Sequence, residues 1–325
     1  MKDNKSILWI FLAFILGFAL PVCSCLGSGL VTFAMIGRMA SAAPTTDVGV
    51  GDAVAVIRLD GAINSTPAQE TVFVSEGITP GRVAKLLQQA EFNPNVKALV
   101  LRVNSPGGSV VASDEIYHQL RDFEKPIVLW MDAVAASGGY YIACGADYVY
   151  AHPDTLTGSI GVISQFINAE ELLDEVGVNV TVITSGPRKD MGSLFREMSE
   201  EEQELWKTIT DEIYQDFVDV VAEARGLPED TVKDLGDGRV YTGRQALEHN
   251  LIDAVGLPDD AIAKAAELGG IELEPGESPR VIELKTTPTF IESLYGFQSR
   301  SAIPTLDEVL SWAGAPSVQY RFTGP

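Results

Sequence analysis

The N-terminal part of the chain contains an uncharged, apolar run that is long enough to cross a membrane. The run extends from Ile7 to Ile36, which is 30 residues without a charged side chain. A transmembrane helix needs about 20 apolar residues, whereas the apolar core of a cleaved secretion signal has about 7–15. Lys2 and Lys5 precede the run and only Arg38 follows it closely, which favours a cytoplasmic amino terminus and an extracytoplasmic body. We therefore expect residues 7–36 to be a single-pass anchor in the cell membrane.

Short segments flank this expected anchor on both sides. Residues 1–6 would be cytoplasmic, and the small, polar residues 37–52 are typical of a linker. Ala40-Ser41-Ala42 has the small residues of a signal-peptidase cleavage site, so removal of the anchor is an alternative. The length of the apolar run favours retention.

The charge of the remaining chain argues against several classes of partner. After residue 44 the chain carries 20 basic and 44 acidic residues. Phosphate backbones and anionic lipid headgroups would repel such a body, so we expect no nucleic-acid partner. Cys144 is the single cysteine outside the apolar run, which excludes a disulfide framework or a cysteine metal cluster in the body. No sequence pattern indicates a metal or an organic cofactor.

The body, residues 53–268, alternates between short apolar strands and amphipathic helices. Strands are expected at Ala53–Leu59, Val96–Val103, Ile127–Met131 and Val178–Ile183. Helices are expected from Pro80 to about Ala90, over Ser109–Phe123, from near Ser137, from Ser199 to about Ala224, after Thr242, and over Ala261–Leu268. This alternation predicts an α/β fold with a mainly parallel sheet covered by helices. Residues 269–325 change in character and form an extension of unknown role, with one possible helix at Leu306–Trp312.

Two glycine-marked turns follow strands and open helices. One is Asn104-Ser105-Pro106-Gly107-Gly108-Ser109, and the other is Ala135-Ala136-Ser137-Gly138-Gly139. Glycines in such turns allow a ligand to approach the backbone, and N–H groups at a helix start stabilise negative charge. Ser137 could act there as a nucleophile. A serine at a helix start more often caps the helix, so the turn alone favours the capping role.

A nucleophilic serine needs a base. The three histidines, His118, His152 and His249, lie outside the glycine-marked turns, so a Ser-His-Asp triad has no support. Lysine is the other base used with serine. Lys189 lies in a loop just past an expected strand, where a solvated surface lysine would be the ordinary interpretation.

Five ordered segments together resemble the signal peptide peptidase A family in its short form. They are Arg102–Gly108, Ala136–Tyr141, Leu156–Val162, Ser185–Asp190 and Asp237–Arg244, and the similarity extends from about Ala53 to Leu268. The resemblance implies a membrane-bound Ser-Lys protease with a fold related to Clp proteases and crotonases. It also implies a ring of identical subunits and a peptide or unfolded-protein substrate, such as signal-peptide remnants.

Matched residue by residue, the motifs of this family imply roles for five positions in this sequence. Ser137 matches the nucleophile, Lys189 the general base, and Ser159 the residue that orients the lysine amine. Gly108 and Gly138 match the positions whose backbone N–H groups form the oxyanion hole. A lysine base must be neutral, so we expect burial to lower the pKa of Lys189.

Three other functions fit the sequence less well. A stomatin-directed membrane protease shares the Ser-Lys chemistry, but the anchor before the body and the absence of later apolar spans argue against it. A crotonase-like acyl-CoA enzyme needs neither an anchor nor the paired Ser137 and Lys189. An inactive peptide-binding scaffold would not need an intact dyad.

Overall fold

A computed structural model describes residues 51–66, 77–274, 276–286 and 317–321 of the chain. The expected anchor at residues 7–36 and the possible helix at Leu306–Trp312 lie outside these ranges. Among the residues that the structure describes, no helix combines the length and the apolar character that a membrane crossing requires.

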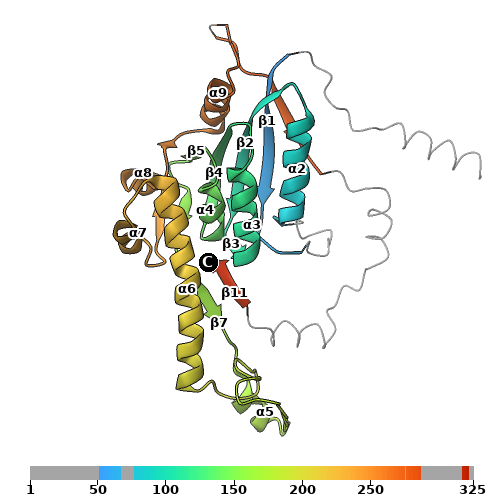
Figure 1. Ribbon diagram of the computed structural model, residues 1–325, viewed down its shortest axis with the longest axis vertical. Coiled ribbons are helices and arrows are strands. Elements are labelled where there is room, and N and C mark those ends of the chain that lie inside the picture. The colour runs from blue at the N-terminus through green and yellow to red at the C-terminus, as the bar shows by residue number, and fades with distance from the viewer. Residues whose placement is uncertain (1–50, 67–76, 275, 287–316, 322–325) are drawn as a thin grey trace, which may run out of the picture. The chain divides into compact units, whose positions relative to one another are not determined.

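A mainly parallel sheet forms the centre of the body (Figure 1), as the sequence predicts. Its strand order is β10-β1-β2-β4-β5-β9, with β6 paired to β4 and β8 paired to β6. The strands are β1 (Ala53–Asp60), β2 (Val96–Ser105), β4 (Ile127–Ala136), β5 (Tyr148–Ala151), β6 (Leu156–Gly158), β8 (Val240–Thr242), β9 (Ala254–Val255) and β10 (Val281–Leu284). Among the described strands of this central sheet, only β6 and β8 pair in antiparallel fashion. The strand predictions at residues 53–59, 96–103 and 127–131 are therefore confirmed.

Helices cover both faces of this sheet because its strands are apolar on both sides. Val54 and Val56 of β1 pack in one core with α9 (Pro258–Leu268). Ala55 and Ile57 face the other way, into a core that includes side chains from six helices. These helices are α2 (Pro80–Phe92), α3 (Val110–Arg121), α4 (Gly138–Ala143), α6 (Glu200–Arg225), α7 (Glu229–Leu235) and α8 (Gly243–Glu248).

Side chains cap the helix starts that the sequence predicts near Pro80, Ser199 and Thr242. The Thr79 hydroxyl accepts a hydrogen bond from the Arg82 N–H at the start of α2. Ser199 forms a reciprocal capping box with Glu202 at the start of α6, and Thr242 forms one with Gln245 at the start of α8 (Gly243–Glu248). Such boxes satisfy backbone N–H groups that the first turn of a helix leaves free.

A second, antiparallel sheet has the order β3-β11-β7. Its strands are β3 (Gly107–Ser109), β11 (Ser317–Arg321) and β7 (Ile163–Gln165). Both β10 and β11 come from residues 269–325, so two parts of this extension complete sheets of the body. Neither strand was expected from the sequence.

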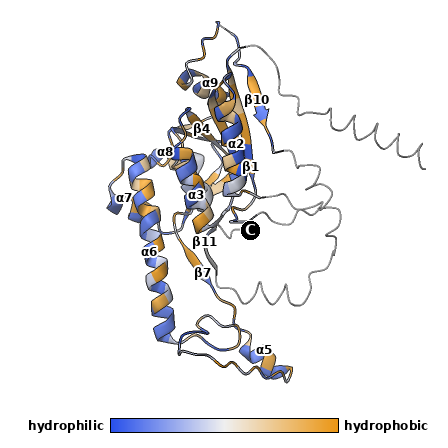
Figure 2. Ribbon diagram, turned by 45° about the vertical axis from the view of Figure 1, so that its right-hand side comes forward, coloured by the Kyte–Doolittle hydropathy of each residue, from blue (hydrophilic) through white to orange (hydrophobic). Residues whose placement is uncertain are grey.

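Residues 166–199, here called the arm, connect β7 to α6. The arm contains α5 (Glu170–Glu175) and lies at the end of α6 away from the central sheet (Figure 1). The predicted strand at Val178–Ile183 is wrong: these residues have no regular structure, because no described strand pairs with them. Apolar and polar residues are interspersed along the arm (Figure 2). Its exposed large apolar side chains are Ile167, Leu172, Val176, Val178, Val180, Val182, Ile183 and Phe195.

Candidate active site

Ser137 lies at a strained junction between β4 and α4. Its backbone has φ 55° and ψ −118°, in a region that residues with a side chain rarely adopt, and only 1% of its surface is exposed. Its N–H donates to the Gly158 carbonyl at 2.7 Å, and its side chain makes no capping bond to α4. The capping interpretation of Ser137 is therefore wrong. Strain at a strand-to-helix turn is the setting in which hydrolases expose a nucleophilic serine.

The structure brings the two predicted oxyanion-hole glycines together. A Cβ added to Gly138 would lie 3.2 Å from the Gly108 nitrogen, and one added to Gly107 would lie 2.6 Å from the Gly138 nitrogen. Gly138 is the first residue of α4, where N–H groups lack a partner within the helix. In the turn that contains Gly107 and Gly108, the Ile63 N–H donates to the Gly107 carbonyl, and the Ile63 carbonyl accepts from the Ser109 N–H. The polar groups of Gly108 therefore face the opposite side, toward β11.

The pairing of β4 with β6 brings Ser159 close to Ser137, because each serine directly follows one of these two strands. Ser159 follows Gly158, whose carbonyl accepts the Ser137 N–H, and it has φ 51° and is buried. The Ser159 N–H donates to the Arg239 carbonyl at 2.8 Å. Arg239 also bonds to Asp237, and this hydrogen bond lowers the pKa of the Asp237 carboxyl to about 2. The Asp237–Arg239 loop thus supports Ser159, a role that the sequence motif did not reveal.

The strand β11 lies directly against the predicted oxyanion hole. Gln319 pairs with Ser109 and Tyr320 pairs with Gly108, while the other edge of β11 pairs with β7. A Cβ added to Gly107 would lie 2.2 Å from the Tyr320 carbonyl oxygen. An extended polypeptide therefore runs through the site between β3 and β7, hydrogen-bonded on both edges.

The Tyr320 side chain fills a pocket between α4 and α6. Its ring stacks on Tyr141 with centroids 5.0 Å apart and contacts Phe217 at 4.8 Å. Its hydroxyl donates to the Ile213 carbonyl at 3.1 Å. Only 1% of Tyr320 is exposed, and this burial raises its pKa, so the phenol stays a neutral donor. The pocket is apolar along its walls and has a hydrogen-bond acceptor at its end.

Lys189 is the one predicted site residue that the structure does not bring to Ser137. It lies on the arm with an exposed side chain, so the expected burial is not found within one chain. Its amine forms no hydrogen bond or ion pair with any described residue. The histidines do not replace it: His118 pairs with Asp114 at 3.5 Å, His152 accepts the Asp154 N–H, and His249 packs on Tyr241.

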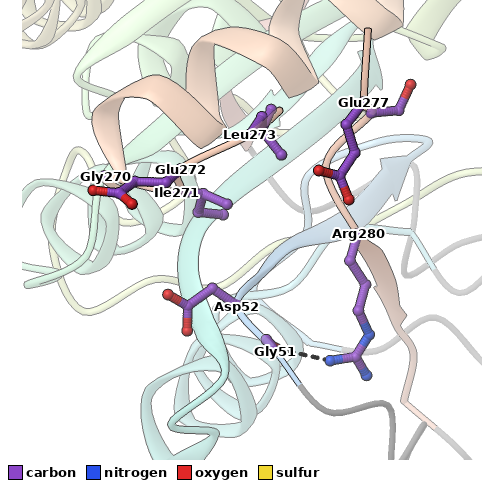
Figure 3. Close-up of a pocket in the computed structure, with 9 residues that line it drawn as sticks. Gly51, Asp52, Gly270, Ile271, Glu272, Leu273, Glu277 and Arg280 are labelled. Carbon is purple, nitrogen blue, oxygen red and sulfur yellow. Dashed lines mark hydrogen bonds between the residues drawn. The ribbon is translucent and has the colours of Figure 1, made fainter. Parts of the chain in front are cut away.

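A pocket of about 690 Å³ lies elsewhere in the body (Figure 3). Its lining includes Gly51, Asp52 and Ile271, and the Arg280 side chain crosses it to the Gly51 carbonyl at 2.9 Å. Gly51 and Asp52 precede the amino end of β1, whereas Ser137 follows the carboxyl end of β4, which runs parallel to β1 through β2. The pocket is therefore at the opposite edge of the sheet from Ser137. Within the described ranges, no group of three or more acidic, histidine or cysteine side chains is placed to hold a metal ion.

Two protein-family models match the chain. The model of peptidase family S49 matches residues 119–272, and the Clp protease model matches residues 64–157. Together the two matches include all five predicted site residues. The Clp protease match agrees with the mainly parallel sheet seen in the structure.

Several proteins are similar to the chain over most of its body. A putative protease, slr0021, from Synechocystis sp. is 42% identical over 212 residues, which cover 63% of this chain and 76% of the relative. A putative signal peptide peptidase SppA from Enterococcus faecium is 37% identical over 209 residues, covering 63% and 60%. Protease 4 from Salmonella typhi is 38% identical over 235 residues, covering 70% of this chain but only 36% of its own length.

Proposed function

Because the chain belongs to peptidase family S49 and is a serine protease of the SppA type, we propose that it is a membrane-anchored endopeptidase with a Ser137–Lys189 dyad. The observation that carries this proposal is the Ser137 geometry. A strained, uncapped serine lies beside two glycine N–H groups at the edge of an extended peptide track. Hydrolysis of an unfolded protein by the purified chain, compared with its Ser137→Ala form, tests the activity.

The chemistry follows from these positions. The neutral Lys189 amine accepts the Ser137 proton as Oγ bonds to the peptide carbonyl carbon. The N–H groups of Gly108 and Gly138 hold the resulting oxyanion, each contributing about 3–4 kcal/mol to transition-state stabilisation. The proton passes from Lys189 to the leaving amine as the C–N bond breaks. Water then adds to the Ser137 ester with Lys189 again taking the proton, and the proton returns to Oγ as the acid leaves.

The lysine in this scheme comes from a second copy of the chain. Lys189 lies on the exposed arm, whereas Ser137 is buried in the body of the same chain. The arm also exposes eight large apolar side chains, more than an isolated monomer usually leaves in water on so short a segment. Docking of the arm onto a neighbouring body would cover these side chains and deliver Lys189 to the neighbour's Ser137 and Ser159. Repetition of this head-to-tail contact closes a ring.

The substrate binds as an extended strand in the position that β11 takes here. Antiparallel pairing to β3 and β7 supplies sequence-independent affinity, and side-chain pockets supply preference. The Tyr141–Phe217 pocket accepts an aromatic or apolar side chain. Residues 7–36 would tether this site at the outer membrane surface, where apolar signal-peptide remnants are released.

Removal of residues 317–325 should raise kcat/KM for a peptide substrate by several-fold. A substrate must displace β11 from both neighbouring strands before it can bind, and truncation removes that competition. Tyr320→Ala in the full chain should have the same effect more weakly, because it empties the aromatic pocket. Steady-state kinetics on one fluorogenic peptide would measure both.

A matched inhibition experiment separates competition from a loss of folding. The free peptide corresponding to residues 315–325 should inhibit the truncated protein competitively, and its alanine variant at the position of Tyr320 should inhibit less. Unchanged kcat/KM in both variants, together with no inhibition by the peptide, would show that β11 does not occupy the substrate track.

A further inference from the structure

Arg196 joins two carboxylates around the loop that carries Lys189. Its Nε and Nη2 donate to the two oxygens of Asp190 at 2.9 and 2.8 Å. Its Nη1 and Nη2 donate to the two oxygens of Glu202 at 2.9 and 2.7 Å, and Nη1 also donates to the Glu197 carbonyl at 3.0 Å. All five N–H donors of the guanidinium are therefore in use. We refer to Asp190, Arg196 and Glu202 as the clamp.

Among the ion pairs that involve the arm, the clamp is the most protected from solvent. The exposed fractions of the three side chains are 33% for Arg196, 19% for Asp190 and 6% for Glu202. Glu202 is also the third residue of α6 and accepts the Ser199 N–H, so the clamp is fixed to a helix start. Bidentate pairs of this kind fix geometry in a way that exposed single pairs do not. The irregular loop that follows Lys189 is therefore tied to α6 at Asp190.

Asp190 directly follows Lys189 in the sequence, so the partner of the Asp190 carboxylate can affect the protonation of the Lys189 amine. A carboxylate free to approach the Lys189 amine would favour the protonated form, which cannot act as a base. Arg196 occupies both oxygens of Asp190, so that carboxylate is directed toward α6. The other charged side chains between Arg188 and Glu202 are Arg188 and Glu201, which pair with each other in an exposed position, and the exposed Glu197 and Glu200.

We propose that Arg196 is a positioning residue for catalysis, which fixes the Lys189 loop to α6 and keeps the Asp190 carboxylate away from the Lys189 amine. This inference rests on the proposed role of Lys189 as the base. Hydrogen bonds from Arg196 lower the pKa of Asp190 and bring that of Glu202 to about 2. The clamp thus stays ionised throughout the pH range in which a lysine base can work, and a change in the rate profile there reports on Lys189.

The test compares kcat against pH for four full-length variants. In Arg196→Gln, kcat should fall about 10- to 100-fold because a loosened loop misplaces the base. In the plot of kcat against pH for this variant, the rising limb on the acid side should also move to higher pH by about one unit or more, because Asp190 is then free to pair with Lys189. Adding Asp190→Asn to Arg196→Gln should return the limb toward its original pH. Arg196→Lys, which keeps a positive partner for Asp190, should lower kcat without moving the limb.

Arg188→Gln is the matched control, because it breaks an exposed pair on the same loop; its profile should be unchanged. KM should stay constant in every variant, and light scattering would verify assembly. An unmoved limb in Arg196→Gln, or a moved limb that Asp190→Asn does not restore, would contradict the inference. An active Lys189→Ala variant, measured alongside, would instead reject the dyad itself.

Discussion

Replacement of Ser137 by alanine should lower kcat by about 10⁴- to 10⁶-fold, and Lys189→Ala should do nearly the same, because the proposed nucleophile and base would act as one unit. Neither change should disturb the fold. The Ser137 hydroxyl makes no cap bond, and the Lys189 amine has no partner among the described residues. Turnover of a fluorogenic peptide by purified variants, with circular dichroism as the check on folding, would measure the effect.

The backbone of Ser137 supplies a further control. Glycine adopts φ 55° without strain, so Ser137→Gly should be inactive and yet more stable than the parent by about 1 kcal/mol. Alanine keeps the strain and should leave stability unchanged. Substantial activity in either purified variant would reject Ser137 as the nucleophile.

Gly138→Ala should lower kcat by about 10²- to 10³-fold, since it would displace the proposed oxyanion-hole donors. The added Cβ would lie 2.6 Å from the Ser113 hydroxyl oxygen and 3.2 Å from the Gly108 nitrogen, so one of the two turns has to move. KM should change much less, because the pairing edges of the peptide track remain. Steady-state kinetics on the same peptide would separate the two constants.

Gly81→Ala is the matched control for this prediction. Gly81 lies in the first turn of α2 and has no atom within 4 Å of an added Cβ, so activity should stay at the parental level. Its stability should rise by about 0.4–1 kcal/mol. A Gly138→Ala variant as active as Gly81→Ala would show that the amide at 138 is not an oxyanion donor.

Local patterns were enough to predict most of the central sheet. The apolar segments at β1, β2 and β4 are buried on both faces, so composition alone identifies them. The caps at Thr79, Ser199 and Thr242 depend on neighbouring residues and were likewise predictable. The alternating valines at 178–182 also have a pattern typical of a strand. A strand needs a pairing partner as well, and the described residues supply none.

The features that the sequence did not reveal depend on contacts between distant residues. The strand β11 has five residues and is held by strands that lie about 150 to 210 positions earlier in the chain. The clamp joins Asp190, Arg196 and Glu202 through an irregular loop, where no periodicity relates them. Of the five predicted site residues, four come together at the ends of β4 and β6 and in β3. The exposed position of Lys189 agrees with the ordinary interpretation of a loop lysine, whereas the burial expected for a neutral base is not found in the described chain.

We expect Ser137 and Lys189 to meet between two copies of the chain, and subunit mixing tests this arrangement directly. Ser137→Ala and Lys189→Ala proteins, each inactive alone, would be dissociated, combined in equal amounts and reassembled. A site then regains both groups wherever a Lys189→Ala chain receives the arm of a Ser137→Ala chain, so activity should recover to about a quarter of the parental value. Mixed assemblies that remain inactive, with their composition verified by native mass spectrometry, would contradict a dyad shared between subunits.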